Sequence, residues 1–234
     1  MSARTIFLDI GAHWGETLEE ALSPLWAFDL VYAFEPDPEA VAVLQTKFAQ
    51  ALTKGQLVIV DSALSDREGE AFLFGANEGG GASLYSEKTD IDSSRRKPVK
   101  LIQARRFFAE NLSANDTILA KLNCEGGEVP ILNDLIDGGE IGKLARVVID
   151  FDIRKVRGKR GEAKALMRKM ERVGFDRFLL AENVMVGSDA IARTRNALAS
   201  MPEAHAACTD RSALPTPPRR PKLTRRVKYF FRYL

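Results

Sequence analysis

Two short apolar runs near the start of the chain each end at a carboxylate, and this pair constrains the fold most. The first run, Thr5–Ile10, includes Asp9 and leads into a turn that contains two glycines. The second run, Leu30–Phe34, is followed directly by Glu35, which lies 26 residues after Asp9. That spacing is typical of a β-α-β unit, whose parallel strands end at the same edge of a sheet. Because open α/β sheets bind ligands at that edge, the sequence predicts a nucleoside-binding edge around Asp9 and Glu35.

The rest of the chain continues the alternation of apolar strands and amphipathic helices. Further strand-like runs occupy Leu57–Val60, Thr117–Leu122 and Ala145–Phe151, and helical spacing of apolar residues fills most segments between them. This alternation predicts an α/β fold with a doubly wound, mostly parallel sheet. We expect Arg177–Ala181 and Val184–Val186 to form a closing pair of strands.

The middle of the chain is less regular. Short strands are predicted at Glu70–Phe74 and Val99–Ala104, and a flexible loop at Asn77–Gly81. Because only about four residues precede the first strand, we expect the lid over a ligand to come from residues 76–98 or from a partner subunit in a homodimer.

The regular pattern ends near residue 209. We therefore expect residues 1–208 to form one domain, and residues 209–234 to form a proline-rich linker and a basic amphipathic tail. Residues 211–234 contain eight lysines and arginines and no acid, whereas the whole chain has a net charge of only +2. This asymmetry predicts a separate partner for the tail. Peripheral contact with an anionic membrane is one interpretation; a solvated end and, less favoured, nucleic-acid binding are the others.

Composition excludes several classes of protein. No apolar run approaches the roughly 18–20 residues that a membrane span requires, and Asp9 interrupts the N-terminal apolar run, unlike a signal peptide. We expect a cytoplasmic protein, with any membrane contact limited to the inner face through the tail. Two cysteines and two histidines are too few for a disulfide framework and argue against a zinc site, so no metal is expected.

The turn after Asp9 favours one class of nucleoside ligand. Its glycines at positions 11 and 15 do not match the G-x-G-x-x-G spacing that holds a dinucleotide pyrophosphate. An acid before the first glycine suits a cationic amino-acid group better than a diphosphate. S-adenosylmethionine carries such a group and a ribose but no phosphate, so it is favoured over NAD. Glu35 is placed to accept hydrogen bonds from both ribose hydroxyls.

Several strings of residues resemble the FkbM family of S-adenosylmethionine-dependent methyltransferases. The segments that carry the resemblance are residues 7–15, 34–38, 63–69 and 82–84 and, most specifically, Lys121–Glu128, which is similar to the family pattern K-I-D-V-E-G-x-E. The resemblance runs from about residue 5 to residue 186. It implies a Rossmann-like class I methyltransferase fold and an O-methyltransferase that acts on a hydroxyl of a sugar, glycan or related metabolite.

The resemblance also implies which residues form the site. The cofactor-binding residues would be Asp9, Gly11, His13, Gly15, Thr17, Glu35, Ser62, Ala63 and Asn123. The catalytic residues, close to the transferred methyl group, would be Glu125, Asn123 and Glu128.

Asn123 departs from the family pattern, which usually has an acid at this position. An amide can replace an acid that only orients the cofactor amine or the acceptor through a hydrogen bond. Glu125 is then the first candidate for the general base, although an acid at a helix start is also stabilised by free N–H groups. Glu128 can instead form a capping box, and His13 is favoured as a loop-shaping residue over a base.

Two other functions remain open at this stage. One is an RNA methyltransferase that holds its substrate with the basic tail; against it, Asn123-Cys124-Glu125-Gly126 lacks the N-P-P-aromatic turn of base methyltransferases. The other is a non-catalytic protein of the same fold that binds cofactor or glycan, which Asn123 keeps open.

Overall fold

The computed structural model describes residues 3–75 and 81–215. The tail helix that the sequence suggests near the C-terminus, and the greater part of the linker before it, lie outside the described residues.

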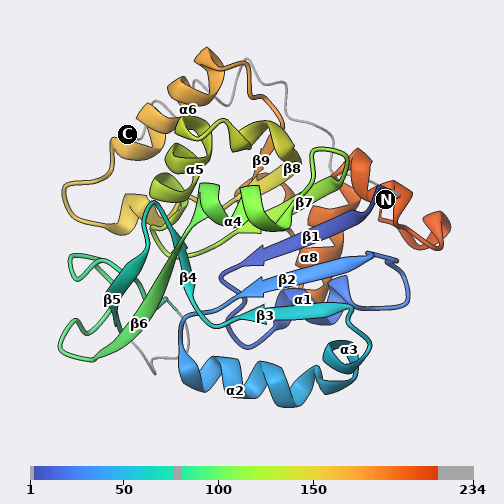
Figure 1. Ribbon diagram of the computed structural model, residues 1–234, viewed down its shortest axis with the longest axis horizontal. Helices are drawn as coiled ribbons and strands as arrows, with labels where there is room; N and C mark the ends of the chain where they lie inside the picture. The colour runs from blue at the N-terminus through green and yellow to red at the C-terminus, as the bar shows by residue number, and fades with distance from the viewer. Residues whose placement is uncertain (1–2, 76–80, 216–234) are drawn as a thin grey trace.

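A six-stranded sheet forms the centre of the molecule (Figure 1). Its strand order is β3-β2-β1-β7-β8-β9, and every neighbouring pair is parallel. The strands are β1 (Thr5–Ile10), β2 (Leu30–Phe34), β3 (Leu57–Val60), β7 (Thr117–Leu122), β8 (Leu144–Ile149) and β9 (Phe178–Leu180). The chain builds outward from β1 through β2 to β3, then returns to the other side of β1 at β7. The crevice at this switch point, outside the carboxyl ends of β1 and β7, is where such sheets bind ligands.

Helices cover both faces of the sheet. The α-helices are α1 (Glu16–Ala21), α2 (Pro38–Lys47), α3 (Ala49–Thr53), α4 (Ala104–Asn111), α5 (Glu128–Asp137), α6 (Glu162–Arg172), α7 (Ala181–Val184) and α8 (Ala190–Ala199). Short 3-10 helices are η1 (Glu140–Lys143), η2 (Asp152–Lys155), η3 (Pro202–Ala206) and η4 (Arg211–Ala213).

A hydrophobic core lies on each face of the central sheet, and side chains that alternate along β1 contribute to both. Ile6 and Leu8 point to the face covered by α4, α5 and α6, whereas Phe7 points to the face covered by α1 and α8. Figure 1 shows α4 and α5 in front of the sheet, with α1 and α8 behind it. All three side chains are at most 1% exposed, as expected for a strand buried on both faces.

A smaller sheet lies beyond the carboxyl ends of β1, β2 and β3 (Figure 1). It contains β4 (Ala63–Ser65), β6 (Arg96–Gln103) and β5 (Gly69–Phe74) in that order, with β4 parallel and β5 antiparallel to β6. The sequence predicted this strand over Val99–Ala104, whereas β6 begins three residues earlier, at Arg96. β4 pairs only with Leu101–Gln103 of β6, so β6 has no neighbour on that side at Pro98. A proline, which has no N–H to donate, is tolerated at such an edge.

The predicted closing pair of strands is wrong. Only β9 forms, and it is parallel to β8. The second predicted strand, Val184–Val186, does not form: α7 ends at Val184, and Met185 and Val186 lie in neither a helix nor a strand. Ala181 and Val184, one helical turn apart, are both buried in the core behind the sheet.

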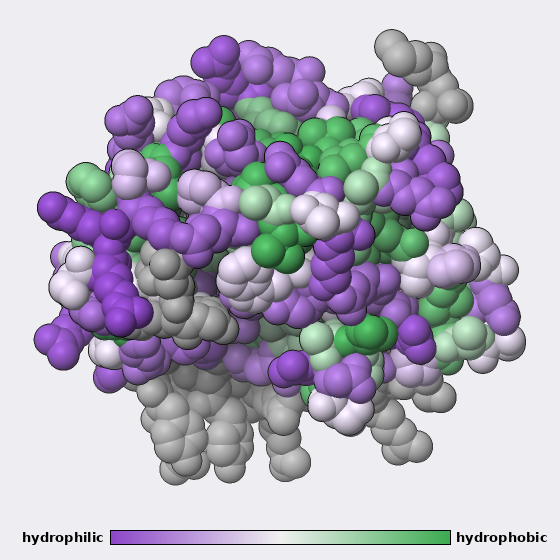
Figure 2. Space-filling view, turned by 90° about the horizontal axis from the view of Figure 1, so that it is seen from below, coloured by the Kyte–Doolittle hydropathy of each residue, from purple (hydrophilic) through white to green (hydrophobic). Residues whose placement is uncertain are grey.

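Large apolar residues are exposed only singly in the described part: Val43, Val58, Phe72, Val173, Val186 and Ile191. Figure 2 shows apolar patches interrupted by hydrophilic side chains on the face seen from below. A helix long and apolar enough to cross a membrane is not found among the described residues.

Candidate functional site

A cleft of about 650 Å³ lies at the carboxyl ends of β1, β2 and β7, where the switch point was expected to place a ligand. The predicted site residues that line it are Gly11, His13, Thr17, Glu35, Ser62, Ala63, Asn123 and Glu125. They come from four separate turns, which the sheet order brings together. Asp9, Gly15 and Glu128, also predicted as site residues, do not line the cleft.

Gly11 lets two turns approach closely. It has a φ of 87°, and a Cβ there would lie 2.0 Å from the carbonyl oxygen of Asn123. Gly15 also has a positive φ, but its missing side chain makes room for Leu44 and the ring of Phe48, which a Cβ would meet at 2.4 Å. Gly15 therefore serves helix packing, and the expectation that it brings backbone up to the ligand is corrected.

Asp9 is neutralised from within the protein. Its side chain is fully buried, and Lys121 Nζ lies 2.9 Å from Asp9 Oδ1 and donates to the Gly11 carbonyl at 3.1 Å. Burial raises the pKa of Asp9, and the charge of Lys121 opposes that rise. Asp9 thus holds Lys121, and Lys121 reaches the cleft. Because Asp9 Oδ2 has no hydrogen-bond partner, a hydrogen bond from a ligand amine to Asp9 stays a prediction.

Lys121 was not predicted as a site residue, although its position in the sequence contained the signal. It is directly opposite Asp9 in the parallel pairing of β1 with β7. A lysine in a strand buried on both faces requires a buried acid nearby, and Asp9 is that acid.

Glu35 is held rigidly at the end of β2. Its Oε2 accepts a hydrogen bond from the backbone N–H of His13 at 2.7 Å, and its Oε1 accepts one from Asp37 N–H at 2.9 Å. Burial raises the pKa of Glu35, and these two hydrogen bonds favour its ionised form. A carboxylate oxygen accepts more than one hydrogen bond, so Glu35 retains capacity for a ligand in the cleft.

His13 shapes the turn between Gly11 and Gly15. It has a φ of 50°, unusual for a residue with a side chain. Its Nδ1 lies 3.0 Å from Glu16 Oε1, and this hydrogen bond lowers the pKa of Glu16. The neighbouring Trp14 ring packs against the imidazole and also lines the cleft.

Asn123 presents an unpartnered acceptor. Its backbone N–H donates to the Ile10 carbonyl at 3.0 Å, whereas its side-chain Oδ1 is buried and has no hydrogen-bond partner. Leaving such an oxygen unsatisfied costs about 1–3 kcal/mol. Because Asn123 lines the cleft, a ligand that supplies an N–H or ammonium donor would remove that cost.

Glu125 is fixed in a strained backbone conformation. Its φ is 54°, and the hydroxyl of Ser83 donates to its carbonyl oxygen at 2.6 Å. Gly126 follows with a φ of 113°, and the ring of Tyr85 lies where a Cβ would project. Left-handed backbone at a non-glycine residue persists only when its surroundings enforce it, and here Ser83 and Tyr85 do so.

The Glu125 side chain lies among charged groups. Lys88 Nζ is 2.9 Å from Glu125 Oε2, and the carboxyl group of Asp152 is close enough to raise the pKa of Glu125. Lys155 in turn pairs with Asp152 at 2.9 Å. Burial, and next Asp152, raise the pKa of Glu125, while Lys88 opposes the rise. Two neighbouring carboxyl groups, each paired with a lysine, can hold and release a proton.

Glu128 supports the turn that carries Glu125. It is fully buried, and its Oε1 accepts hydrogen bonds from Gly126 N–H at 3.0 Å and Cys124 N–H at 3.3 Å. Burial raises its pKa to about 8. Glu128 therefore holds the turn that carries Glu125. It is the first residue of α5 and does not form the expected capping box, and its place beside the reacting atoms stays a prediction.

Sequence reasoning missed Lys88 altogether. Its side chain is buried although the segment around it is polar, and it enters the site through a long-range β-bridge between Lys88 and Val156. No local pattern marks such a contact.

A metal centre is not supported within residues 3–75 and 81–215, where no three His, Cys, Asp or Glu side chains gather suitably.

Comparisons with known proteins identify a family for this chain. The family model for the methyltransferase FkbM domain matches residues 9–177, which is most of the chain. Among solved structures, the chain is similar to the crystal structure of methyltransferase FkbM from Methylobacillus flagellatus KT, with 12% sequence identity and a TM-score of 0.48. The match covers 73% of this chain but only 37% of that protein. No curated protein matches the sequence.

Proposed function

The chain belongs to the FkbM methyltransferase domain family, and from that premise we propose that it uses S-adenosylmethionine to methylate a hydroxyl of a sugar, glycan or related metabolite. The observation that carries the proposal is the placement of two acceptors at the switch point. The Glu35 carboxylate and the unpartnered Asn123 Oδ1 both lie at the same cleft.

The residues present fit this cofactor. Glu35 would accept hydrogen bonds from the ribose hydroxyls, and Asn123 Oδ1 would accept one from the amino group. Ser62 and Ala63, which follow β3 directly, would lie beside the adenine. When bound, S-adenosylmethionine supplies an electrophilic methyl group on a sulfonium.

The carboxyl pair of Glu125 and Asp152 would serve the acceptor. A hydroxyl must lose its proton as its oxygen gains a methyl group, and a carboxylate oxygen of Glu125 is the proposed proton acceptor. Lys88 favours the ionised form of that carboxylate, while the Ser83 hydrogen bond fixes its backbone. Asp152, paired with Lys155, can share the proton that Glu125 takes up.

Calorimetry with S-adenosylmethionine and with NADH tests the cofactor assignment. We expect binding of the former alone, and an Asn123→Ala variant should weaken it by roughly tenfold or more, because a hydrogen bond from a charged donor is lost. Asn115→Ala, which alters an exposed residue remote from the cleft, is the matched control. Tight NADH binding with no response to S-adenosylmethionine would contradict the proposal.

A second measurement tests the proton acceptor and the acceptor class. Glu125→Gln should retain cofactor binding but lose methyl transfer by a factor of about 10²–10⁴, the usual contribution of a general base. Mass spectrometry of glycans from cells with and without the protein should reveal a mass gain of one CH₂ group. Full turnover by Glu125→Gln would exclude Glu125 as the base.

A further inference from the structure

The segment from Arg154 to Arg172 is strongly basic. It contains nine lysines and arginines but only two acids, Glu162 and Glu171. The segment comprises the end of η2, a turn and the whole of α6. Such a concentration of one charge on a folded surface raises the local potential and attracts anions.

This basic segment begins inside the cleft. Arg154 and Lys155 line the cleft wall. Beyond them, Thr89 N–H donates to the Lys155 carbonyl at 3.0 Å and Arg157 N–H donates to the Glu87 carbonyl at 3.2 Å. This strand-like pairing buries Val156, whereas Lys155 and Arg157 are exposed. Arg157 is therefore exposed two residues beyond Lys155, which lines the cleft.

The charge continues along α6. Ala163, Leu166 and Met170 are the buried face of this helix, so Arg168 and Arg172, both exposed, lie on the side away from the core. Together with Arg157 and Arg160, these arginines form a surface that we call the basic ridge.

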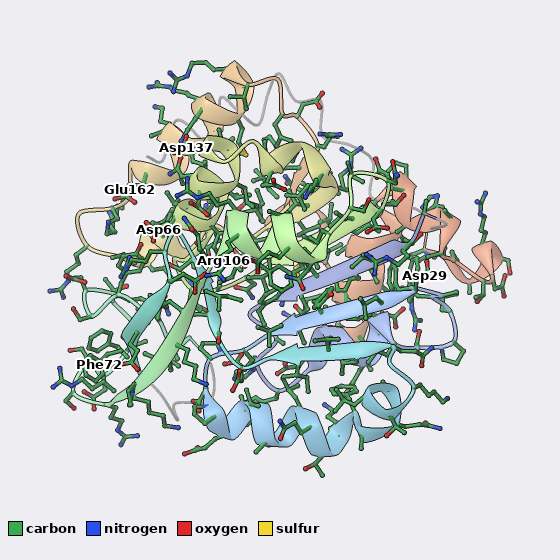
Figure 3. All side chains as sticks on the ribbon, viewed as in Figure 1. Asp29, Asp66, Phe72, Arg106, Asp137 and Glu162 are labelled. Carbon is green, nitrogen blue, oxygen red and sulfur yellow. The ribbon has the colours of Figure 1, made fainter. Side chains whose placement is uncertain are left out.

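Two of the acids near the ridge are paired with lysines. Glu162, labelled in Figure 3 at the start of α6, pairs with Lys159 at 2.8 Å. Asp137 at the end of α5, also labelled there, pairs with Lys169 at 2.7 Å. Within the described residues, no ion pair is formed by any arginine of the ridge: Arg157, Arg160, Arg168 and Arg172.

The surface chemistry selects among anionic partners. Stacking of nucleic-acid bases needs aromatic side chains, and none is exposed from Arg154 to Arg172. Shallow membrane insertion needs several apolar side chains, whereas Val173 is the one large apolar residue exposed beside α6 in the described structure. Guanidinium groups match carboxylate and phosphate geometry. A polar, anionic chain that also enters the cleft fits these features best.

We propose that the acceptor is an anionic glycan, whose carboxylate or phosphate groups bind the basic ridge while the hydroxyl to be methylated enters the cleft. This inference rests on the proposed function, because it assigns the acceptor of the same cleft. Arg154 and Lys155 connect the two parts, since they line the cleft wall at the start of the ridge.

Binding of defined oligosaccharides to the full chain tests the inference. The probes are an oligogalacturonate, which carries carboxylates, a polyol-phosphate oligomer, which carries phosphates, and a neutral dextran oligomer of similar length. The test variant is Arg157→Gln/Arg160→Gln/Arg168→Gln. The control, Arg67→Gln/Arg95→Gln/Arg106→Gln, removes the same charge from exposed arginines elsewhere.

We expect at least one anionic probe to bind more tightly than dextran, and the comparison of the two identifies the preferred anionic group. The ridge variant should bind that probe about tenfold more weakly at low salt, and the control variant less than about twofold. Equal weakening by both variants, or equal binding of dextran, would overturn the proposal. So would ridge-dependent binding of an RNA oligomer or of phosphatidylserine vesicles that is tighter than binding of either anionic probe.

Calorimetry separates this inference from the proposed function. The ridge variant should bind S-adenosylmethionine like the unmodified chain, because none of its three arginines lines the cleft. Loss of cofactor binding by the ridge variant alone would overturn the separation of ridge from cofactor site. Ridge-dependent glycan binding by a chain that never binds S-adenosylmethionine would remove the proposed cofactor but leave the ridge as a glycan-binding surface.

Discussion

At the scale of single residues, the buried carboxylates around the cleft differ in how their charge is balanced. Asp9 has a full countercharge in Lys121. Glu35 has two backbone N–H donors. Glu128 also has two such donors for one oxygen, but its second oxygen is buried without a partner and burial raises its pKa to about 8. The three acids should therefore respond differently to mutation and to pH.

Replacing Lys121 with methionine should destabilise the fold strongly. The substitution leaves Asp9 buried without its countercharge, which typically costs about 3–5 kcal/mol. Urea unfolding measures this loss. The double variant Asp9→Asn/Lys121→Met removes the orphaned charge and should recover a large part of it. If the double variant is no more stable than the single one, the charge pairing is not the reason for the loss.

Glu128 should make stability fall in alkaline solution. Because its pKa is raised to about 8 in the folded state, the folded protein holds this proton more tightly than the unfolded chain. The resulting stabilisation is complete below the unfolded pKa of about 4.5 and is lost as pH rises through about 8. Between about pH 6 and pH 9 this group alone accounts for a decrease of about 2 kcal/mol.

The matched variant is Glu128→Gln, which resembles the protonated acid and does not titrate. Its amide oxygen can still accept from Gly126 and Cys124, so it should fold. Denaturant unfolding at about pH 6 and about pH 9 should show a smaller difference for the variant than for the unmodified protein. Identical pH dependence in the two proteins would mean that Glu128 does not titrate in this range.

At the scale of helices, α8, which follows the segment matched by the family model, is held to α1 by hydrogen bonds to the buried Glu20. Glu20 of α1 is 1% exposed and accepts two hydrogen bonds from Arg195 of α8, at 2.9 Å and 2.8 Å. Trp26 also donates to Glu20 at 2.9 Å. Because the family match ends at residue 177, α8 lies outside it, yet α8 covers one face of the sheet together with α1.

Arg195→Met should therefore destabilise the whole domain by about 2 kcal/mol, because it leaves Glu20 buried with only the Trp26 hydrogen bond. Arg106→Met is the control: it removes an arginine from a pair with Glu110 in which both side chains are exposed, and such pairs contribute about 0–1 kcal/mol. Thermal unfolding measures both. Equal losses would show that the burial of Glu20 adds nothing to the link between α1 and α8.

The strands of the central sheet were largely predictable because their signals are local. Apolar runs fix β1, β2, β3 and β7 with their observed bounds. The α7 helix was not predictable, since its four residues become helical through burial of Ala181 and Val184 against distant parts of the core.

The same distinction applies to the candidate site. The turns that carry Gly11, Glu35 and Asn123 follow their strands directly, so their meeting at one edge follows from the strand order. Lys88 reaches Glu125 only through tertiary pairing with Val156, and no spacing in the sequence encodes that contact.

At the scale of the whole molecule, charge is distributed unevenly along the chain. Residues 216–234 lie outside the described structure, but their sequence carries seven lysines and arginines and no acid. Each basic residue close to an anionic leaflet contributes about 1 kcal/mol of binding. We propose that this tail provides peripheral contact with an anionic membrane, separately from the basic ridge.

Changing the seven basic residues of the tail to glutamine in the full chain should therefore abolish binding to phosphatidylserine vesicles. Cofactor affinity should stay the same, because the described residues that line the cleft all come before the tail. Vesicle co-sedimentation measures the first effect and calorimetry the second. Phosphatidylcholine vesicles, which carry no net charge, should bind neither protein, and raised salt should weaken binding of the unmodified chain because it screens the attraction. Unchanged phosphatidylserine binding by the tail variant would eliminate the membrane role, and the basic tail would then need a different partner.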